Sequence, residues 1–237
     1  MQGFYRVSYW TIGATIRALW RVRAVGRENV PLEGPVILAS NHLSFLDHFV
    51  TGAVVKRQLF FISKVQHFES KVKSFFFKRW GVIPLARGSG DKAAFDASVE
   101  VLRRGDAFII YPEGTRSLDG KLHKGHTGVA RLALLTGAPV VPVACLGTFE
   151  NLPKGKSFPK FGKVEVRFGK PLDFSRFQGK EEDKETLRRI TDTVMQEIRA
   201  LSGQEYVHEY QYNPEYVPKD GSKRRAPEEN AGAEVRA

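Results

Sequence analysis

The sequence predicts an α/β fold, in which a largely parallel central sheet is flanked by helices. Short apolar runs suited to buried strands alternate with amphipathic segments of about 10–15 residues. Apolar residues make up 42% of the 237-residue chain, which is enough for one substantial core. We divide the chain into residues 1–22, a domain over residues 23–203 and a tail over residues 204–237.

Apolar runs bounded by turn residues or charges are predicted to form the strands. They are 36–39, 59–62, 82–85, 107–111, 140–146 and 163–168. Pro84 lies inside the third run and donates no backbone hydrogen bond, so it indicates an edge or irregular position in the sheet. Segments with helical periodicity lie between the strands and after the last one. They are 45–55, 66–80, 91–104, 125–136 and 182–202.

Residues 4–22 predict one further helix at the N-terminus. Aromatic and aliphatic side chains recur there at spacings of three and four, with arginines beside them. Such a helix suits the membrane interface, where aromatic rings lie at headgroup depth, although it could also pack on its own domain. The run is shorter than the ~20 apolar residues that span a bilayer, and no secretory signal is evident.

The positive charge belongs to the domain and not to the tail. The chain has a net charge of +11, yet residues 204–237 hold five basic and seven acidic residues. Residues 1–27 hold five arginines and no acid, and residues 56–80 hold seven basic residues against one acid. Such a surface attracts anionic lipid, nucleic acid or phosphorylated substrates. Because no nucleic-acid motif is recognisable, we expect a membrane lipid partner and no nucleic acid.

Two further features concern the single cysteine and the tail. Cys145 stands alone, so no intramolecular disulfide can form, and we expect a small buried strand residue there, not a nucleophile. Residues 206–217 are rich in tyrosine and are expected to lie along the surface. Residues 218–237 are polar and poor in large apolar side chains, so we expect disorder.

His42 and Asp47 are the first candidates for chemistry. The histidine directly follows a predicted strand, and five residues would span about 500° on a helix, so the two could not share a helical face. They can meet only if His42 lies in the loop and Asp47 in the first turn of the next helix. The carboxylate would then hold one imidazole nitrogen and leave the other free as a base. The alternative is a capping aspartate beside an unrelated histidine.

A second candidate segment, residues 111–117, also follows a predicted strand. Gly114 permits close backbone approach, Thr115 offers a hydroxyl and Arg116 offers a fork for phosphate, although a plain turn would look similar. Arg87 follows another strand and could be a second phosphate ligand or an ordinary surface charge. Lys124, in a small basic loop, could add a phosphate contact.

These runs together resemble the glycerolipid acyltransferases, and most of all bacterial 1-acylglycerol-3-phosphate acyltransferases. The four blocks of that family appear here in order. They are Asn41-His42-Leu43-Ser44-Phe45-Leu46-Asp47, the run from Gly81 to Arg87, Glu113-Gly114-Thr115-Arg116, and Val140-Val141-Pro142-Val143. A histidine and aspartate at this spacing are weak evidence alone, but they are strong evidence when the later blocks follow. The general likeness extends over residues 20–200.

The resemblance implies a role for each block. His42 is the general base and Asp47 orients it. Arg87 and Arg116 bind the glycerol phosphate, and we place Glu113, Gly114 and Thr115 in the same substrate site. The fourth block, around Val141 and Pro142, is associated with the acyl donor. The family needs no metal or redox cofactor, and its donor is acyl-CoA or acyl-carrier protein.

The expected reaction is therefore transfer of a fatty acyl group to the sn-2 hydroxyl of 1-acyl-glycerol-3-phosphate, which forms phosphatidic acid in phospholipid biosynthesis. The resemblance implies a peripheral or monotopic enzyme at the cytoplasmic face of the cell membrane. Three alternatives remain open. The acceptor could be another lysophospholipid or a glycolipid, the protein could bind anionic membranes without catalysis, or the same pair could hydrolyse a thioester.

Overall fold

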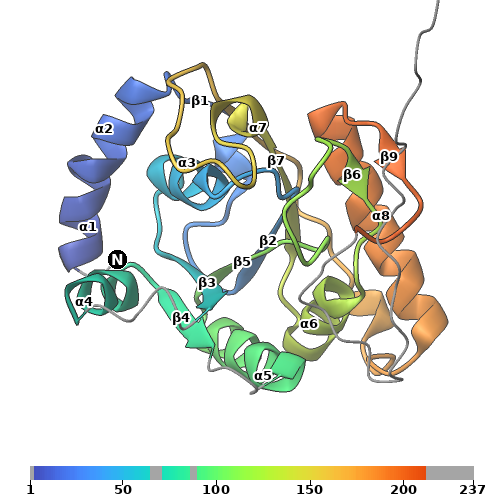
Figure 1. Cartoon of the computed structure of the whole chain (residues 1–237). Helices are drawn as coiled ribbons and strands as arrows, with labels where there is room; N and C mark the ends of the chain where they lie inside the picture. The colour runs from blue at the N-terminus through green and yellow to red at the C-terminus, as the bar shows by residue number, and fades with distance from the viewer. Residues whose placement is uncertain (1–2, 65–70, 86–89, 212–237) are drawn as a thin grey trace, which may run out of the picture.

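A computed structural model describes residues 3–64, 71–85 and 90–211, and it confirms the α/β fold class. Seven strands form one sheet in the order β1-β8-β7-β2-β5-β3-β4 (Figure 1). Neighbouring strands are parallel except for β7 and β8. The strands are β1 Arg23–Val25, β2 Val36–Ser40, β3 Leu59–Lys64, β4 Val82–Leu85, β5 Ala107–Ile110, β7 Val140–Leu146 and β8 Glu165–Phe168.

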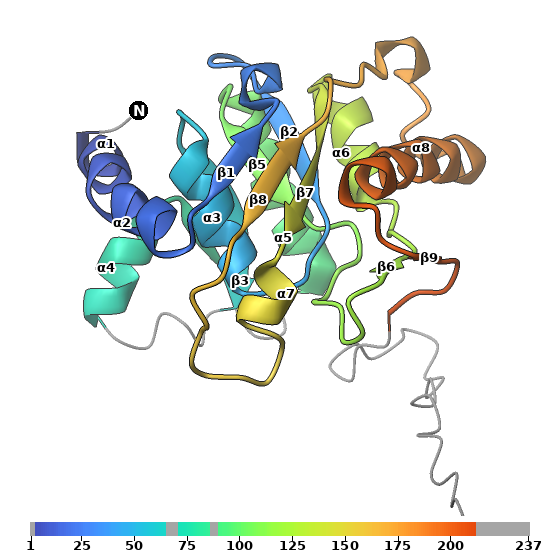
Figure 2. The same cartoon turned by 90° about the horizontal axis from the view of Figure 1, so that it is seen from above.

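Helices cover both faces of the sheet (Figures 1 and 2). On one side lie α2 Ile12–Leu19 and α3 Leu46–Val54, and α1 Gly3–Trp10 extends from α2. On the other side lie α5 Gly90–Arg103, α6 Gly128–Thr136 and α8 Lys184–Ser202. The helix α4 Lys71–Arg79 lies beside α1, and the short α7 Thr148–Asn151 follows β7. The two cores are thus separated by the sheet.

The strand β2 occupies the centre of this arrangement. All five of its residues have 0% exposure, and it pairs in parallel with β5 on one side and β7 on the other. Val36 and Leu38 pack in the core under α3, whereas Ile37 and Ala39 pack in the core under α5, α6 and α8. A strand covered on both faces is a continuous apolar run, which is why its sequence does not alternate.

The N-terminal helix predicted over residues 4–22 is bent at Thr11, which separates α1 from α2. The hydroxyl of Thr11 donates to the carbonyl of Val7 at 2.9 Å, and the hydroxyl of Thr15 donates to the carbonyl of Thr11 at 3.2 Å. Such hydroxyl bonds to the preceding turn compete with the backbone ladder and bend helices. The amphipathic period continues through the bend, so it does not reveal it.

Other elements agree with the sequence to within a few residues, and the exceptions are short. The strand β4 is at the sheet edge and pairs only with β3, as Pro84 indicated. The sequence did not predict the three-residue β1 or a separate two-stranded sheet, because strands of two or three residues are too short to show a hydrophobic period. This second sheet pairs β6 Leu122–His123 with β9 Tyr206–Val207. Arg87 and the segments 66–70 and 212–237 lie outside the described residues.

Cys145 is a buried strand residue, as expected. It has 0% exposure within β7, and its Sγ lies 3.4 Å from the hydroxyl of Thr51. Burial raises the pKa of its thiol, with the charge of Asp47 as a further cause, so the thiol stays protonated. A protonated, inaccessible thiol is a poor nucleophile.

A stability test follows from the turn between β7 and α7. Gly147 has a φ of +81°, and a Cβ there would clash with the carbonyl oxygen of Lys163. Gly34 has a similar φ of +75° with nothing within 4 Å. Both alanine variants carry a left-handed backbone cost of about 1–2 kcal/mol. We expect Gly147→Ala to lower the free energy of unfolding in urea by clearly more than Gly34→Ala, since only it also meets a backbone clash. Equal losses would contradict this.

Candidate active site

His42 and Asp47 meet at the end of the central strand. The histidine lies in the loop that follows β2, and the aspartate lies in the first turn of α3. The imidazole Nδ1 is 3.0 Å from Oδ2 of Asp47. The ends of parallel strands are where such folds gather functional side chains. The geometry is the one that the five-residue spacing required.

The carboxyl group of Asp47 is fully buried, and its donors all reach Oδ2, whereas Oδ1 has no partner among the described residues. Its Oδ2 also accepts the backbone N–H groups of Leu43 and Ser44, both at 2.8 Å. The N-terminus of α3 adds the favourable end of a helix dipole. These donors hold the carboxylate in one orientation, so it fixes the orientation of the imidazole as well.

The other nitrogen of the imidazole is left for chemistry. When Nδ1 donates to Asp47, the neutral ring presents Nε2 as an acceptor. Among the described residues, no hydrogen-bond partner contacts Nε2, and the side chain of His42 is 14% exposed. The pair can therefore accept a proton from a bound hydroxyl.

Two rings that were given no catalytic role pack against His42. The Tyr111 ring lies nearly parallel to the imidazole, with centroids 3.9 Å apart and planes 22° apart. The His48 ring lies 4.7 Å from Tyr111 and 5.5 Å from His42. Burial lowers the pKa of His48 well below its usual value and raises that of Tyr111 well above, so both stay neutral. The sequence could not show this, because Tyr111 meets His42 only through the pairing of β2 and β5.

Glu113 joins three backbone segments. Its Oε1 accepts the N–H of His42 at 2.9 Å, and its Oε2 accepts the N–H of His123 at 3.0 Å. The N–H of Ser117 donates in turn to the carbonyl of His42 at 2.7 Å. Glu113 is 1% exposed, and burial raises its pKa to about 8, against the opposing effect of the two N–H donors. The side chain holds the His42 loop against the 113–123 segment.

The rest of that motif turns toward the site. Gly114 has a φ of +72°, and a Cβ there would lie 3.2 Å from the ring of His126. The hydroxyl of Thr115 accepts from the ammonium of Lys154 at 3.4 Å. Arg116 has no hydrogen-bond or ion-pair partner among the described residues, and its charge contributes to the lowered pKa of His48. Its charge therefore acts on His48, and its guanidinium is available to an anion.

The segment that follows α8 also reaches this region, which the sequence did not indicate. The amide of Gln204 accepts from Asn41 Nδ2 at 2.7 Å and donates to the carbonyl of Gly120 at 2.7 Å. The ammonium of Lys124 lies over the ring of Tyr210, 5.2 Å from its centroid. The start of the predicted tail therefore packs beside the residue that precedes His42.

Other candidates do not join the site. Val141 and Pro142 are buried inside β7, between β2 and β8. Ser44, which belongs to the first block, is buried, and its hydroxyl donates to the carbonyl of Leu152 at 2.6 Å. Within the described ranges, no group of His, Cys, Asp or Glu side chains could hold a metal ion.

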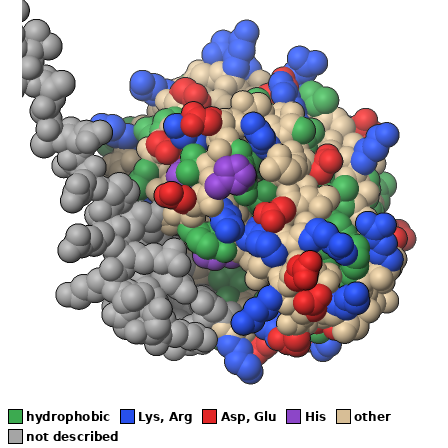
Figure 3. Space-filling view, turned by 90° about the vertical axis from the view of Figure 1, so that its right-hand side faces the viewer, with side chains coloured by type: hydrophobic (Ala, Val, Ile, Leu, Met, Phe, Trp, Pro, Cys, Tyr) green, Lys and Arg blue, Asp and Glu red, His purple; other side chains and the backbone are tan. Residues whose placement is uncertain are grey.

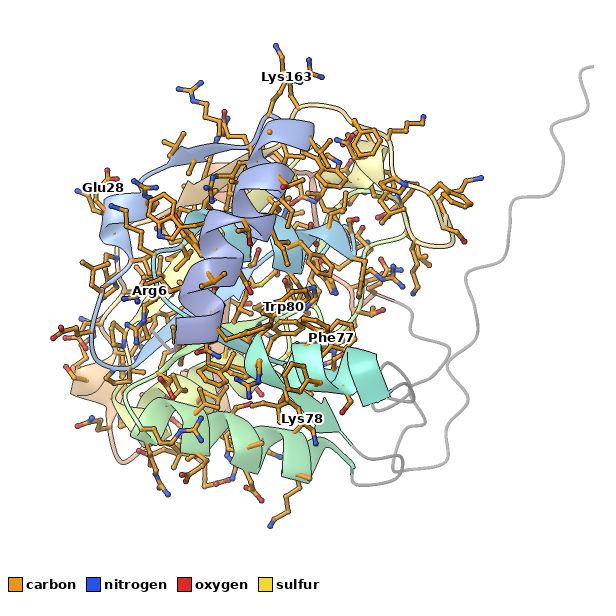
Figure 4. All side chains as sticks on the ribbon, turned by 90° about the vertical axis from the view of Figure 1, so that its left-hand side faces the viewer. Arg6, Glu28, Phe77, Lys78, Trp80 and Lys163 are labelled. Carbon is orange, nitrogen blue, oxygen red and sulfur yellow. The ribbon has the colours of Figure 1, made fainter. Side chains whose placement is uncertain are left out.

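An apolar cavity of about 100 Å³ begins beside the imidazoles. Helices α1, α2 and α3, strands β3 and β4, and the end of α4 contribute to its wall. His48 lines the cavity, and the centroid of its ring lies 4.4 Å from that of Phe61, another lining residue. Figure 4 shows Phe77 and Trp80, which also line it, beside α1. The site thus has a hydrocarbon-like compartment next to the candidate base.

Comparisons with known proteins agree with this geometry. A family model described as "Acyltransferase" matches residues 21–146. A chloroplast 1-acyl-sn-glycerol-3-phosphate acyltransferase of Arabidopsis thaliana is 32% identical over 68% of this chain and 46% of its own length. A lyso-ornithine lipid O-acyltransferase of Pseudomonas aeruginosa is 29% identical over 64% of this chain and 58% of its own length. The chain spans about half the length of the plant relatives it matches.

A solved structure extends the similarity to the whole fold. The crystal structure of a 1-acyl-sn-glycerophosphate acyltransferase from Thermotoga maritima superposes with a TM-score of 0.66 and 27% identity. The match covers 85% of this chain and 82% of that one. The seven-stranded sheet and its flanking helices therefore belong to a fold already seen in such an enzyme.

The raised pKa of Glu113 predicts a pH dependence of stability. The carboxyl titrates near 4.5 in the unfolded chain and at about 8 in the folded one, so the folded state holds the proton between these values. Its contribution to the free energy of unfolding is complete below about pH 4.5 and is lost as the pH rises to about 8, by at most ~1.4 kcal/mol per unit. We expect Glu113→Gln to flatten the decline in stability between about pH 5 and pH 8.

Urea unfolding at a series of pH values measures this slope. Glu100→Gln, at an exposed position of α5, is the matched control and should keep the slope of the wild type. If Glu113→Gln and the wild type lose stability in parallel, the buried carboxyl is not the group that titrates.

Proposed function

The chain belongs to the acyltransferase family, and on that premise we propose that it acylates the sn-2 hydroxyl of 1-acyl-glycerol-3-phosphate and so forms phosphatidic acid. The acyl donor is a thioester, either acyl-CoA or acyl-carrier protein. The observation that carries the proposal is the hydrogen bond between His42 and the fully buried Asp47, which leaves Nε2 of His42 without a partner among the described residues. An apolar cavity begins at the neighbouring His48.

In the proposed reaction, Nε2 of His42 takes the proton of the acceptor hydroxyl as its oxygen attacks the thioester carbonyl. The carbon–sulfur bond then breaks, and the thiolate leaves with the proton that His42 returns. Asp47 keeps Nδ1 protonated and stabilises the imidazolium between these steps. General-base assistance of this kind supplies about 10²–10⁴-fold, and positioning of the two substrates supplies a further part. No acyl-enzyme is required.

Arg116 supports a phosphorylated acceptor. A guanidinium can bind two phosphate oxygens at once, and this one lacks a partner in the described part of the chain. Lys124 and Arg87 are proposed as further cations for the phosphate, Lys124 from its position beside Tyr210 and Arg87 from the resemblance alone. An ornithine headgroup has no phosphate, so the cations favour lysophosphatidate over the acceptor of the Pseudomonas relative.

The cavity beside His48 supports an acceptor or donor with a hydrocarbon chain. Its wall is mostly apolar, and the lowered pKa of His48 keeps this lining ring uncharged. Burying a methylene group in such a place contributes about 0.8 kcal/mol. We assign the cavity to an acyl chain, and Val141 and Pro142 to the sheet core behind the site.

We further propose that the enzyme works as a peripheral protein at the cytoplasmic face of the membrane. In the described ranges, no helix has the length and apolar character needed to cross a bilayer. Exposed apolar side chains lie along α1 and α2, with Val7 63% and Trp10 68% exposed. Phe75 and Phe76 of α4 are also exposed and contact Phe4. Apolar side chains beside arginines suit the anionic inner leaflet.

Turnover of lysophosphatidate with acyl-CoA tests the assignment of the base. We expect His42→Ala to lower kcat by about 10²–10⁴-fold or more, and Asp47→Asn to have a large effect of the same kind through the tautomer. His208→Ala, at an exposed position, is the control. Near-normal turnover by a folded His42→Ala protein would refute the role. Lyso-ornithine lipid as a second acceptor tests the headgroup, and free fatty acid without acylated acceptor would indicate a hydrolase.

Arg116→Ala tests the phosphate contact. A charge-assisted hydrogen bond contributes about 1.5–3 kcal/mol, so we expect KM for lysophosphatidate to rise about 10- to 100-fold with little change in KM for acyl-CoA. Arg103→Ala removes an exposed arginine of α5 and should leave both constants unchanged. An effect of Arg116→Ala on donor use alone would contradict the assignment.

A further inference from the structure

A lysine-rich loop, residues 152–163, joins α7 to β8 and has no part in the chemistry proposed above. It carries four lysines and no acidic residue. They are Lys154, Lys156, Lys160 and Lys163. The last three are exposed, whereas Lys154 is half-buried and reaches Thr115. The loop is therefore a local concentration of positive charge on the surface of the domain.

Two phenylalanines accompany the lysines. Phe158 is 89% exposed, more than any other large apolar side chain described, and Phe161 is 56% exposed. A single exposed apolar side chain needs no explanation, but two exposed aromatic rings among four lysines indicate an interaction site. At a membrane surface, aromatic rings lie at headgroup depth and neighbouring lysines contact lipid phosphates, so this combination suits a lipid partner.

The loop is held in place by its own hydrogen bonds. The backbone N–H of Lys160 donates to the carbonyl of Asn151 at 2.7 Å, and Asn151 Oδ1 accepts the N–H of Gly162. A Cβ on Gly162 would lie 2.8 Å from the same side chain, so the close approach requires glycine. The backbone is thus held on both sides of Phe161, which fixes where its exposed ring is presented.

The loop is continuous with the N-terminal helices. The indole N–H of Trp20 donates to the carbonyl of Lys160 at 2.8 Å, and its ring lies 5.2 Å from that of Phe161. A guanidinium nitrogen of Arg21 donates to the carbonyl of Phe161 at 3.2 Å. Figure 4 shows Lys163 beyond the end of α2, on the side of the molecule that α1 and α2 cover. Leu19, 44% exposed, lies at the end of α2.

The opposite side of the molecule has a different surface. Figure 3 shows the face of α8, where acidic and basic side chains are interspersed. A mixed face attracts neither sign of charge strongly, whereas a run of lysines without acids attracts an anionic surface. The distribution of charge therefore favours residues 152–163, and not the face of α8, as the contact for an anionic partner.

We propose that residues 152–163, together with the end of α2, form a docking surface for a bilayer that contains anionic phospholipid. Lys156, Lys160 and Lys163 contact lipid phosphates, and the ring of Phe158 enters the headgroup layer. This surface is a second membrane contact, in addition to the one proposed for α1, α2 and α4. It rests on the proposed function only because that function makes a membrane lipid the substrate.

Sedimentation of the full chain with vesicles tests the charge. Each lysine near an anionic surface contributes about fivefold to binding, and salt screening reduces the product. We expect the variant K156Q/K160Q/K163Q to lower partitioning onto vesicles of phosphatidylcholine and phosphatidylglycerol at least tenfold. The variant K170Q/K180Q/K184Q removes three exposed lysines elsewhere and should have a much smaller effect. Equal effects of the two variants would overturn the proposal, since net charge alone would then explain binding.

A second variant tests the ring. Phe158→Ser should weaken binding to the same vesicles, whereas Leu32→Ser, which removes a side chain 68% exposed, should not. Unchanged binding by Phe158→Ser would remove the ring from the contact and overturn the proposal. Thermal unfolding confirms that each variant is folded.

The two proposals can fail separately. Lys154 is left intact in all variants because it contacts Thr115, so turnover of detergent-dispersed lysophosphatidate should match the wild type. Turnover of lysophosphatidate embedded in vesicles should fall with binding. A wild-type protein that binds vesicles but transfers no acyl group would refute the proposed function and leave the docking surface intact. Loop variants that bind as the wild type does would refute the surface alone.

Discussion

The buried carboxyl group of Glu113 is the contact on which the site depends. It lies between the amides of His42 and His123, in a place where a side chain of another shape would leave two N–H groups without acceptors. An unpaired buried donor costs about 1–3 kcal/mol. Because Ser117 also holds the carbonyl of His42, the backbone of the candidate base is fixed on both sides. A catalytic group must be held within roughly 0.5 Å, so this support is as necessary as the ring itself.

The site lies at a boundary between polar and apolar surroundings. Asp47 bonds to His42, and the charge of Arg116 acts on His48. The apolar cavity begins at His48, whose lowered pKa keeps it neutral. A lysolipid has the same division, since its hydroxyl lies between a headgroup and a chain. The position of His42 between the two halves thus follows the position of the reacting group in such a molecule.

The sequence predicted those features that depend on neighbouring residues or on order along the chain. Apolar runs predicted the main strands, Pro84 indicated the sheet edge, and the spacing of His42 and Asp47 left one arrangement in which the two could meet. It missed the bend at Thr11 and the shortest strands, and the other features it did not predict depend on contacts between distant segments. Gln204 meets Asn41 across 163 positions, and Tyr111 stacks on His42 because β2 and β5 pair. No local pattern encodes such contacts.

The cavity was the least predictable feature, because several separate elements build it and the sequence of no single element indicates it. Its outer wall is formed by the N-terminal helices. Arg17 of α2 donates to the carbonyl of Ala53, and α2 packs against α3 at Gly13, where a Cβ would make an ordinary contact with Cα of Ala53 at 3.7 Å. The same helices expose apolar side chains on their outer side, and Ile12 both lines the cavity and is 42% exposed.

This arrangement bears on how a lipid acceptor reaches the base. Exposing a chain to water costs about 0.8 kcal/mol for each methylene group, which amounts to roughly 12 kcal/mol for about 15 of them. A wall that contacts lipid on its outside and the cavity on its inside shortens that path. Under the proposed function, docking against the membrane and binding of the chain therefore involve the same two helices.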